Sequence, residues 1–241
     1  MTDVLGDKQR ARTAKEKDRR RDSIVQAALE LFLQKPAKLP TMSAIANRAG
    51  VAKGTTYIYF DTKESIYLAL LEDELHGWLK HIEKELEYHD KDPMQQLMRL
   101  LMSFAQNQPH LWPLSSLSHA VIETNIDSKA LLSYKTKLAQ KYRATARAIR
   151  EHLNLPEKHA AATEAMLMQT YAYLLGNWQV CNPPASISRL LKGPSFRVLQ
   201  PDFTESSRQG LEQLWTGFIE QQRKEEGGAG VLNRLFNRNR S

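Results

Sequence analysis

A run of hydrogen-bond donors lies between Lys53 and Tyr59, in the sequence KGTTYIY. Ammonium, hydroxyl and phenol groups can all donate to the oxygens of a phosphate. On a helical wheel, Thr56 and Phe60 share one side. The residues across from them are left facing solvent: Gly54, Thr55, Ile58 and Tyr59. This second face therefore needs a partner outside the chain.

The segment before this run supplies the element that would position it. Small or apolar residues recur at helical spacing at Met42, Ile45, Ala46 and Ala49. Thr41 suits the N-cap of this helix, and Gly50 suits the left-handed residue that ends it. The pattern predicts helix, tight turn and helix. Proteins of this design place the second helix in the major groove of DNA. The alternative is an ordinary helical hairpin packed in a core, and the basic and aromatic residues after the glycine favour DNA.

The stretch TMSAIANRAGVAKGTTYIYFDTKESIYLALL, residues 41–71, resembles the DNA-binding domain of the tetracycline-repressor family of bacterial transcriptional regulators. The resemblance rests on the turn Ala49-Gly50-Val51, the Gly54–Phe60 run, and Lys63 opening the next helix. Thr56 departs from the leucine usual in the family, and Ile58 departs from a polar or aromatic residue. The resemblance implies an all-α fold of about nine helices, with a three-helix head on a larger ligand-binding and dimerisation body. The DNA-binding residues that it implies are Thr41, Ser43, Lys53, Gly54, Thr55, Tyr57, Ile58, Tyr59 and Lys63.

The charge distribution agrees with a DNA-binding head. The net charge is +7, and residues 1–61 hold twelve Lys or Arg against seven Asp or Glu, a balance of +5. Residues 227–241 add +3, which leaves −1 for the middle of the chain. Positive potential concentrated on the head is expected if phosphates are its partner.

Length, apolar breaks and charge predict four parts. Residues 1–16 are expected to form a disordered basic arm, 17–62 the helix-turn-helix domain, 63–226 the effector and dimerisation domain, and 227–241 a flexible basic tail. The first helix is predicted from about Lys17 to Gln34, and the last from about Thr204 to Arg223. The stretch 185–203 is expected to be irregular, because prolines and a glycine interrupt it.

The body should hold an apolar or amphipathic effector if the resemblance holds. The position of the effector pocket in the family points to seven candidate residues: Phe104, Trp112, His119, Glu123, Tyr134, Tyr171 and Trp178. His119 and Glu123 are four apart, so they can hydrogen-bond each other or a ligand. Aromatic residues also fill any helical core, and core packing is the alternative for each of these rings.

A homodimer is expected for two reasons. In the family the last two long helices pair with their copies, and two strongly apolar helices need cover that two-fold association provides. The interface residues predicted on this basis are Leu174, Leu211, Leu214, Trp215 and Phe218. A dimer would present two heads about 34–36 Å apart, one turn of a palindromic operator.

Other classes of function have little support in the sequence. No phosphate loop, HExxH or CxxC motif is present, so we expect no catalytic residue, metal ion or cofactor. One cysteine, a charged N-terminus and no apolar run near the ~20 residues that span a bilayer predict a cytoplasmic protein without a membrane partner.

We therefore expect a DNA-binding regulator, a repressor released by its ligand. Two alternatives stay open from the sequence. One is a helical protein that binds nucleic acid without sequence preference, and it would bind operator and random duplex equally. The other is a ligand-binding helical domain with a non-functional head, and it would ignore DNA.

Overall fold

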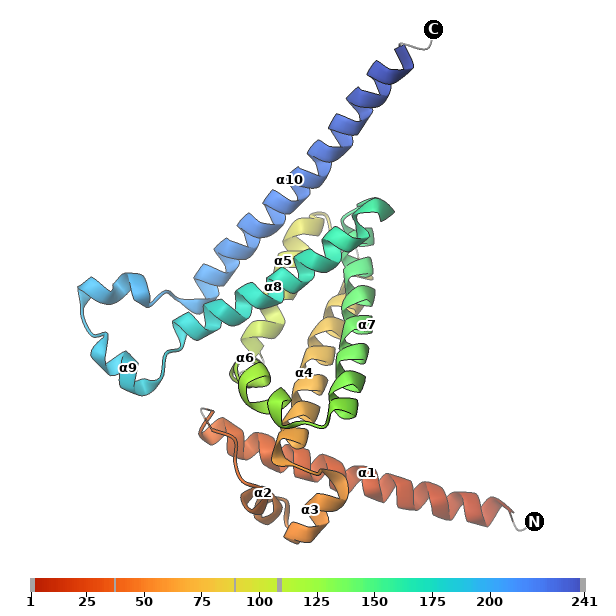
Figure 1. The fold of residues 1–241 in the computed structure, drawn as a ribbon, viewed down its shortest axis with the longest axis vertical. Helices are drawn as coiled ribbons and strands as arrows, with labels where there is room; N and C mark the ends of the chain where they lie inside the picture. The colour runs from red at the N-terminus through yellow and green to blue at the C-terminus, as the bar shows by residue number, and fades with distance from the viewer. Residues whose placement is uncertain (1–2, 37, 89, 108–109, 239–241) are drawn as a thin grey trace. The chain divides into compact units, whose positions relative to one another are not determined.

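The structure is a computed structural model that describes residues 3–36, 38–88, 90–107 and 110–238, with side chains described for 15–36, 38–88, 90–103 and 110–224. These residues form helices and their connections, without a strand (Figure 1). The expected all-α class is therefore confirmed.

The chain forms two compact units, one of residues 1–76 and 109–138 and the other of residues 77–108 and 139–241. The boundary between them falls within helices α4 (Lys63–Glu85) and α7 (Ser128–His152). The units thus divide the chain differently from the expected boundary between residues 62 and 63.

The first unit contains α1 (Asp3–Gln34), α2 (Met42–Ala49), α3 (Lys53–Tyr59) and the start of α4. It also holds α6 (Leu111–Ser116), a π-helical turn η1 (Ser118–Ile122), a 3₁₀ turn η2 (Glu123–Asn125) and the start of α7. Its core is built from fully buried side chains of these helices, including Ile24, Phe32, Ile45, Ile66, Tyr67 and Leu71. Phe32 and Tyr67 pack with ring centroids 5.7 Å apart, which fixes α4 against α1.

The second unit contains the rest of α4 and α7, α5 (Pro93–Asn107), a 3₁₀ turn η3 (Glu157–His159) and α8 (Ala160–Cys181). A connection with two short helices, α9 (Ala185–Leu190) and η4 (Pro194–Leu199), leads to α10 (Phe203–Arg238). Helices α8 and α10 lie side by side (Figure 1). Trp215 is fully buried between them, and its indole Nε1 donates to Thr170 Oγ1 at 3.0 Å.

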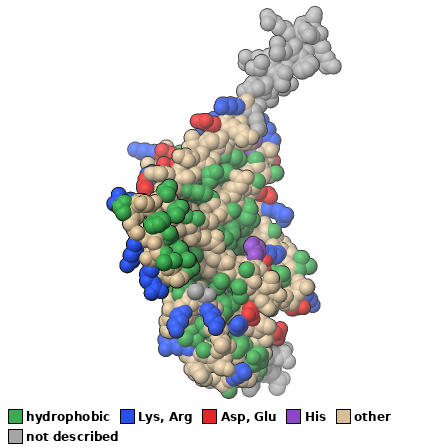
Figure 2. All heavy atoms as spheres, turned by 60° about the vertical axis from the view of Figure 1, so that its left-hand side comes forward, with side chains coloured by type: hydrophobic (Ala, Val, Ile, Leu, Met, Phe, Trp, Pro, Cys, Tyr) green, Lys and Arg blue, Asp and Glu red, His purple; other side chains and the backbone are tan. Residues whose placement is uncertain are grey.

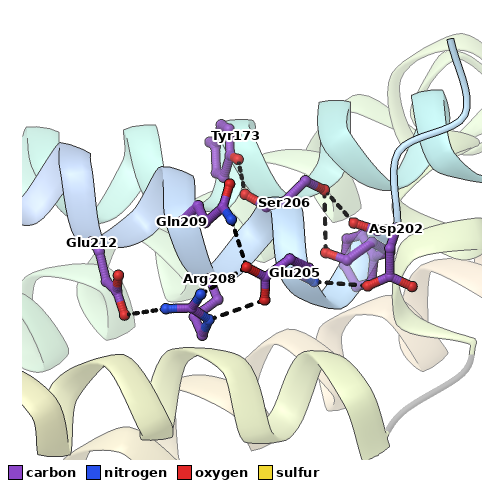
Figure 3. Close-up of polar contacts among 8 residues, drawn as sticks. Tyr173, Asp202, Glu205, Ser206, Arg208, Gln209 and Glu212 are labelled. Carbon is purple, nitrogen blue, oxygen red and sulfur yellow. Dashed lines mark hydrogen bonds and ion pairs between the residues drawn. The ribbon is translucent and has the colours of Figure 1, made fainter. Parts of the chain in front are cut away.

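The start of α10 is fastened to α8 and to itself by polar contacts (Figure 3). Asp202 caps the helix, because its Oδ1 accepts from the backbone N–H of Glu205 at 2.8 Å. The Tyr173 hydroxyl of α8 donates to the carbonyl oxygen of Ser206 at 2.6 Å. Arg208 pairs with Glu205 one turn before it and with Glu212 one turn after it.

Three expectations about secondary structure differ from the structure. Helix α1 begins at Asp3, so residues 3–16 are helical and not a disordered arm. No proline interrupts this stretch, its Lys, Arg, Gln and Ala residues favour helix, and the Glu16–Arg20 pair at 3.1 Å has helical i, i+4 spacing. Helix α10 continues to Arg238, beyond the end predicted near Arg223 and through residues that were predicted to form a flexible tail. The stretch expected to be irregular contains α9 and η4.

Candidate nucleic-acid interface

The turn between α2 and α3 has the geometry that its sequence predicts. Thr41 caps α2, because its Oγ1 accepts from the backbone N–H of Ala44 at 3.2 Å. Gly50 ends α2 in the left-handed region at φ 67°, ψ 30°, a conformation that glycine adopts without steric cost. The backbone N–H of Val51 then donates to the carbonyl oxygen of Ala46 at 3.0 Å. Both capping predictions are confirmed, and together they fix the direction in which α3 leaves the turn.

Helix α3 is held in place by its inner side only. Thr56 is its one buried residue, and its hydroxyl donates to the carbonyl oxygen of Lys53 at 2.7 Å. This bond satisfies a polar side chain that stands at a position where a leucine was expected. The backbone N–H of Phe60, the buried residue that follows α3, donates to the carbonyl oxygen of Thr56 at 3.0 Å. The Arg21 guanidinium of α1 lies 5.3 Å from the Phe60 ring centroid and covers it.

The outer side of α3 agrees with the helical wheel in part: of the four residues predicted to face solvent, Gly54 and Ile58 are exposed. Lys53 and Gly54 are exposed, and Tyr57 and Ile58 expose 47% and 71% of their surface. Thr55 and Tyr59 are half-buried. No atom lies within 4 Å of where a Cβ would stand on Gly54, so the backbone of the first turn of α3 is open to a ligand.

The remaining predicted DNA-binding residues lie on the elements around α3. Thr41 and Ser43 are exposed at the start of α2, and Lys63 is half-buried at the start of α4, with Nζ 3.6 Å from Glu64 Oε1. The structure therefore places all nine predicted residues at or near the ends of α2, α3 and α4 within one compact unit.

Two basic residues that the sequence interpretation omitted stabilise this unit. Arg21 covers Phe60 as described, and Arg48 at the end of α2 is paired with Glu30 of α1, with its Nε donating to Glu30 Oε2 at 2.6 Å. The position of Arg48 just before the Gly50 turn suggested an ion pair. Its partner, Glu30, is 18 residues away and could not be predicted from local spacing.

The predicted effector residues fall in both units and are partly brought together. In the first unit, His119 Nδ1 lies 3.0 Å from Glu123 Oε2, as the i, i+4 spacing predicted. Glu123 also accepts from Lys135 Nζ at 2.7 Å and from Ser118 Oγ at 2.6 Å. Burial opposes ionisation of Glu123, but these donors outweigh it and hold the pKa of its carboxyl below the usual value. Glu123 is thus already engaged by the chain.

The aromatic candidates are packed to different degrees. In the first unit Trp112 and Tyr134 are buried. In the second unit Tyr171 and Trp178 are half-buried, and the Tyr171 ring lies 6.3 Å from the ring of Trp78. The side chain of Phe104 lies outside the described residues. The role of these rings in effector binding stays a prediction.

Neither a metal site nor a membrane span is found in the described part of the chain. No group of three or more His, Cys, Asp or Glu side chains there is placed to hold a metal ion. Nor is any described helix both long and apolar enough to cross a bilayer.

A capped helix, a glycine turn and a second helix with an unpaired outer face define the class of helix-turn-helix DNA-binding proteins. Two family models match the chain. The model for bacterial regulatory proteins of the tetR family matches residues 24–70, and the model for the tetracyclin repressor-like C-terminal domain matches residues 72–222. The chain belongs to the tetR family of DNA-binding transcriptional regulators, as its sequence predicted.

Relatives of known name are similar over part of their length. The chain is 33% identical over 64 residues to the fatty acid metabolism regulator protein of Bacillus subtilis, covering 27% of this chain and 33% of that protein. It is 34% identical over 92 residues to the regulator TtgR of Pseudomonas putida, covering 38% and 43%. It is 30% identical over 142 residues to RutR of Escherichia coli, covering 56% and 65%. The chain thus spans between a third and two-thirds of these relatives.

Solved structures share the fold. FadR from Bacillus subtilis, in complex with stearoyl-CoA, has a TM-score of 0.54 and 18% identity, over 80% of this chain and 96% of that one. FadR from Thermus thermophilus, in complex with lauroyl-CoA, has a TM-score of 0.52 and 19% identity, over 83% and 93%. At these identities the likeness establishes the all-helical architecture.

Proposed function

We propose that the protein is a ligand-released repressor that binds a palindromic operator as a homodimer. The observation that carries the DNA-binding part is the outer face of α3, where Lys53, Tyr57 and Ile58 are exposed beside an open Gly54 backbone. The phenol and ammonium groups suit phosphate oxygens, and Ile58 suits the methyl group of a thymine. The head therefore offers both positioning contacts and an apolar base contact.

The proposed dimer uses faces of α8 and α10 different from those first predicted. Leu174, Leu211 and Trp215 have no exposed surface in the single chain, and Leu214 and Phe218 are half-buried. The apolar stripe of α10 therefore packs largely against the rest of its own chain. The rings of Trp215 and Phe218 meet edge-on, with centroids 5.7 Å apart. Beyond the partly exposed Leu214 and Phe218, the surface that α8 and α10 leave for a partner lies on the opposite faces of these helices.

Those opposite faces are suited to close helix packing. On α8, exposed residues recur at i, i+4, i+7 and i+11, namely Ala161, Ala165, Met168 and Ala172. On α10 the outer face is formed by the exposed residues Gln209, Glu212, Gln213, Thr216, Gly217 and Glu220. A Cβ on Gly217 would meet no atom within 4 Å, so nothing in the single chain requires a glycine there. Glycine in a helix interior lowers helix stability by about 1 kcal/mol relative to alanine. Close approach of a second chain would be a physical reason for a glycine at position 217.

The proposed effector is a small apolar or amphipathic molecule bound in the C-terminal domain. The two FadR proteins that share the fold are complexes with acyl-CoA molecules, which makes lauroyl-CoA a reasonable first probe. Such a ligand releases DNA only to the extent that it binds the non-DNA-binding conformation more tightly than the DNA-binding one.

The test begins with selection of bound sequences from a random duplex pool, followed by anisotropy titrations of the selected duplex over a range of salt. We expect a palindrome, and an affinity at least about 10³-fold above random duplex. Lys53→Ala should reduce the salt slope by about 0.9 for each lost phosphate contact, and Tyr57→Phe should weaken binding at fixed salt. Lys158→Ala, which removes an exposed lysine from η3, is the matched control.

Four results would contradict the proposal. Equal affinity for selected and random duplex would favour the non-specific nucleic-acid-binding alternative. Absence of DNA binding together with lauroyl-CoA binding would favour the ligand-binding domain with a non-functional head. A wild-type chain that sediments as a monomer, or a Gly217→Leu variant that dimerises as well as wild type, would reject the proposed interface.

A further inference from the structure

Helix α1 carries a run of charged residues just before the part of it that packs in the head. We call residues 15–20, with the sequence KEKDRR, the basic segment. Every residue of the segment is exposed, and the first buried residue of α1 among those described is Ile24. The helix begins at Asp3, so the segment lies in its interior and is held in helical geometry. Because this stretch is polar on every side, its side chains serve no core and are available to a partner outside the chain.

The basic segment lies next to the end of α3. Arg21, the residue that follows the segment, has its guanidinium 5.3 Å from the centroid of the Phe60 ring, directly after α3. Arg21 also lines one hollow with Tyr59, the last residue of α3. The far end of the segment, Lys15, precedes Arg21 by about 9 Å along the helix axis. All these residues belong to one compact unit, and Figure 1 shows α1 extending past α2 and α3.

The cations of the basic segment are largely unpaired. Residues 15–21 carry five Lys or Arg against two Asp or Glu, a balance of +3. Arg20 is paired with Glu16 at 3.1 Å. Three other cations are exposed and form no ion pair with a described side chain: Lys15, Lys17 and Arg19. Figure 2 shows further Lys and Arg side chains over the part of the molecule that α1, α2 and α3 form. The segment thus adds unpaired positive charge to a part that is already basic.

We propose that the basic segment is a second DNA-binding element, which contacts phosphates beside the groove that α3 occupies. The inference rests on the proposed function, because it takes α3 to lie in a major groove. That groove is about 8.5 Å deep, and packed helices lie about 8 to 10 Å apart. With α3 inserted, the phosphate backbone at the edge of the groove therefore rises to about the level of the next helix layer, to which α1 belongs.

A phosphate backbone suits the basic segment better than a single anion does. Lys15 and Arg19 are one turn apart on one side of α1, whereas Lys17 points to the other side, so the three cations do not converge on one point. Duplex DNA carries one charge per about 1.7 Å of its axis, and each neutralised phosphate releases condensed counterions. Phosphate contacts carry no sequence information. The segment therefore raises the affinity for operator and for random duplex alike, whereas α3 distinguishes them.

A charge-neutralised variant of the full chain tests the proposal. The segment variant combines Lys15→Gln, Lys17→Gln and Arg19→Gln, and glutamine has a helix propensity close to those of lysine and arginine. The control variant removes the same charge from exposed positions on α4, α7 and η3 through Lys80→Gln, Lys129→Gln and Lys158→Gln. Equal far-UV circular dichroism of the two variants and wild type verifies that the helices are kept. Affinities for the selected operator and for random duplex are measured by anisotropy from about 0.1 to 0.5 M salt.

We expect the segment variant to lose one or two phosphate contacts, which lowers the salt slope by about 0.9 to 1.8. If these contacts contribute nothing at 1 M salt, the affinity at 0.1 M falls about 8- to 60-fold. Random duplex should lose affinity by a similar factor. The control variant should keep the wild-type slope, since charges far from the duplex are screened within about 10 Å at 0.1 M salt.

Two results separate this inference from the function on which it rests. If the segment variant has the slope and affinity of the control variant while Lys53→Ala still weakens binding, the second element is refuted and the DNA-binding function stands. If wild type binds no duplex, the function fails and the second element fails with it.

Phosphate ethylation interference locates the contact. In wild type, ethylation should interfere at phosphates beside the groove, and this interference should persist in Lys53→Ala but disappear in the segment variant. Interference that the segment variant loses only at phosphates also lost in Lys53→Ala would show that the variant acts through α3, and it would overturn the proposal.

Discussion

Gly210 lies in α10 where this helix passes Tyr173 of α8, and replacing it with alanine should destabilise the protein. A Cβ built on Gly210 lies 2.9 Å from Cε1 of Tyr173 and closer still to its Cζ and hydroxyl oxygen. Carbon atoms do not approach so closely, so the Tyr173 ring must move. The ring cannot move freely, because its hydroxyl donates to the carbonyl oxygen of Ser206 at 2.6 Å (Figure 3).

The expected change in the free energy of unfolding follows from three contributions. Overpacking at a helix contact costs roughly 1 to 3 kcal/mol. Loss of the hydrogen bond from Tyr173 to Ser206 costs roughly 0.5 to 1.5 kcal/mol. The better helix propensity of alanine returns roughly 1 kcal/mol. Gly210→Ala should therefore lower the free energy of unfolding by roughly 0.5 to 3.5 kcal/mol.

A double-mutant cycle isolates the steric contribution. Unfolding by urea is followed by circular dichroism for wild type, Gly210→Ala, Tyr173→Ala and the double variant, at one protein concentration. Once the ring is absent, the three nearest atoms that the added methyl group would meet are gone, so Gly210→Ala should stabilise the Tyr173→Ala protein by about 1 kcal/mol. The same substitution should thus change sign between the two backgrounds. If Gly210→Ala has the same effect in both, the close packing of α8 and α10 at this residue is wrong.

Three further changes test other contacts. Thr41→Ala removes the cap that accepts from Ala44 and should lower stability by about 0.5 to 2 kcal/mol in urea unfolding, whereas Thr41→Ser should restore most of it. Tyr67→Phe removes the buried hydroxyl that donates to the carbonyl oxygen of Ala28 at 3.2 Å, and it should lower the free energy of unfolding by about 0.5 to 1.5 kcal/mol. Burial raises the pKa of Tyr67, so absorbance at 295 nm should show this phenol titrating only with unfolding. Because the pKa of Glu123 is lowered, its carboxylate stabilises the fold fully above the usual pKa of 4.5 and loses this effect as pH falls through the lowered value. The stability difference between wild type and Glu123→Gln, measured by urea unfolding from pH 7 to pH 3, should therefore shrink only below about pH 4.5. A constant difference would show that Glu123 is not ionised in the native pairing.

The parts of the fold that could be predicted from sequence are those set by residues close together in the chain. Thr41 as a cap and Gly50 as a left-handed residue depend on a few neighbouring backbone groups, and both were correct. The prediction of an open face on α3 is also local, because it depends on the positions of Thr56 and Phe60 on a helical wheel. The i, i+4 pairing of His119 with Glu123 has the same local origin.

The parts of the structure that the sequence did not predict concern questions that a local pattern does not answer. A periodic apolar stripe such as Leu211 and Trp215 shows that a helix face must be covered, but it does not show by what. In this chain α8 covers it, through partners such as Thr170, which is 45 residues away. The lengths of α1 and α10 were underestimated, because a charged or glycine-containing stretch without apolar periodicity was equated with disorder.

Because Thr56 is the one buried residue of α3, the residue that anchors this helix is distinct from the residues on its outer face. Under the proposed function, changes at Lys53, Gly54, Tyr57 and Ile58 would alter DNA recognition with little effect on whether the protein folds, because none of these four residues is buried. On that proposal, new operator preferences would be accessible by single substitutions without prior stabilisation elsewhere, and α3 would be a suitable segment for engineering regulators with altered targets.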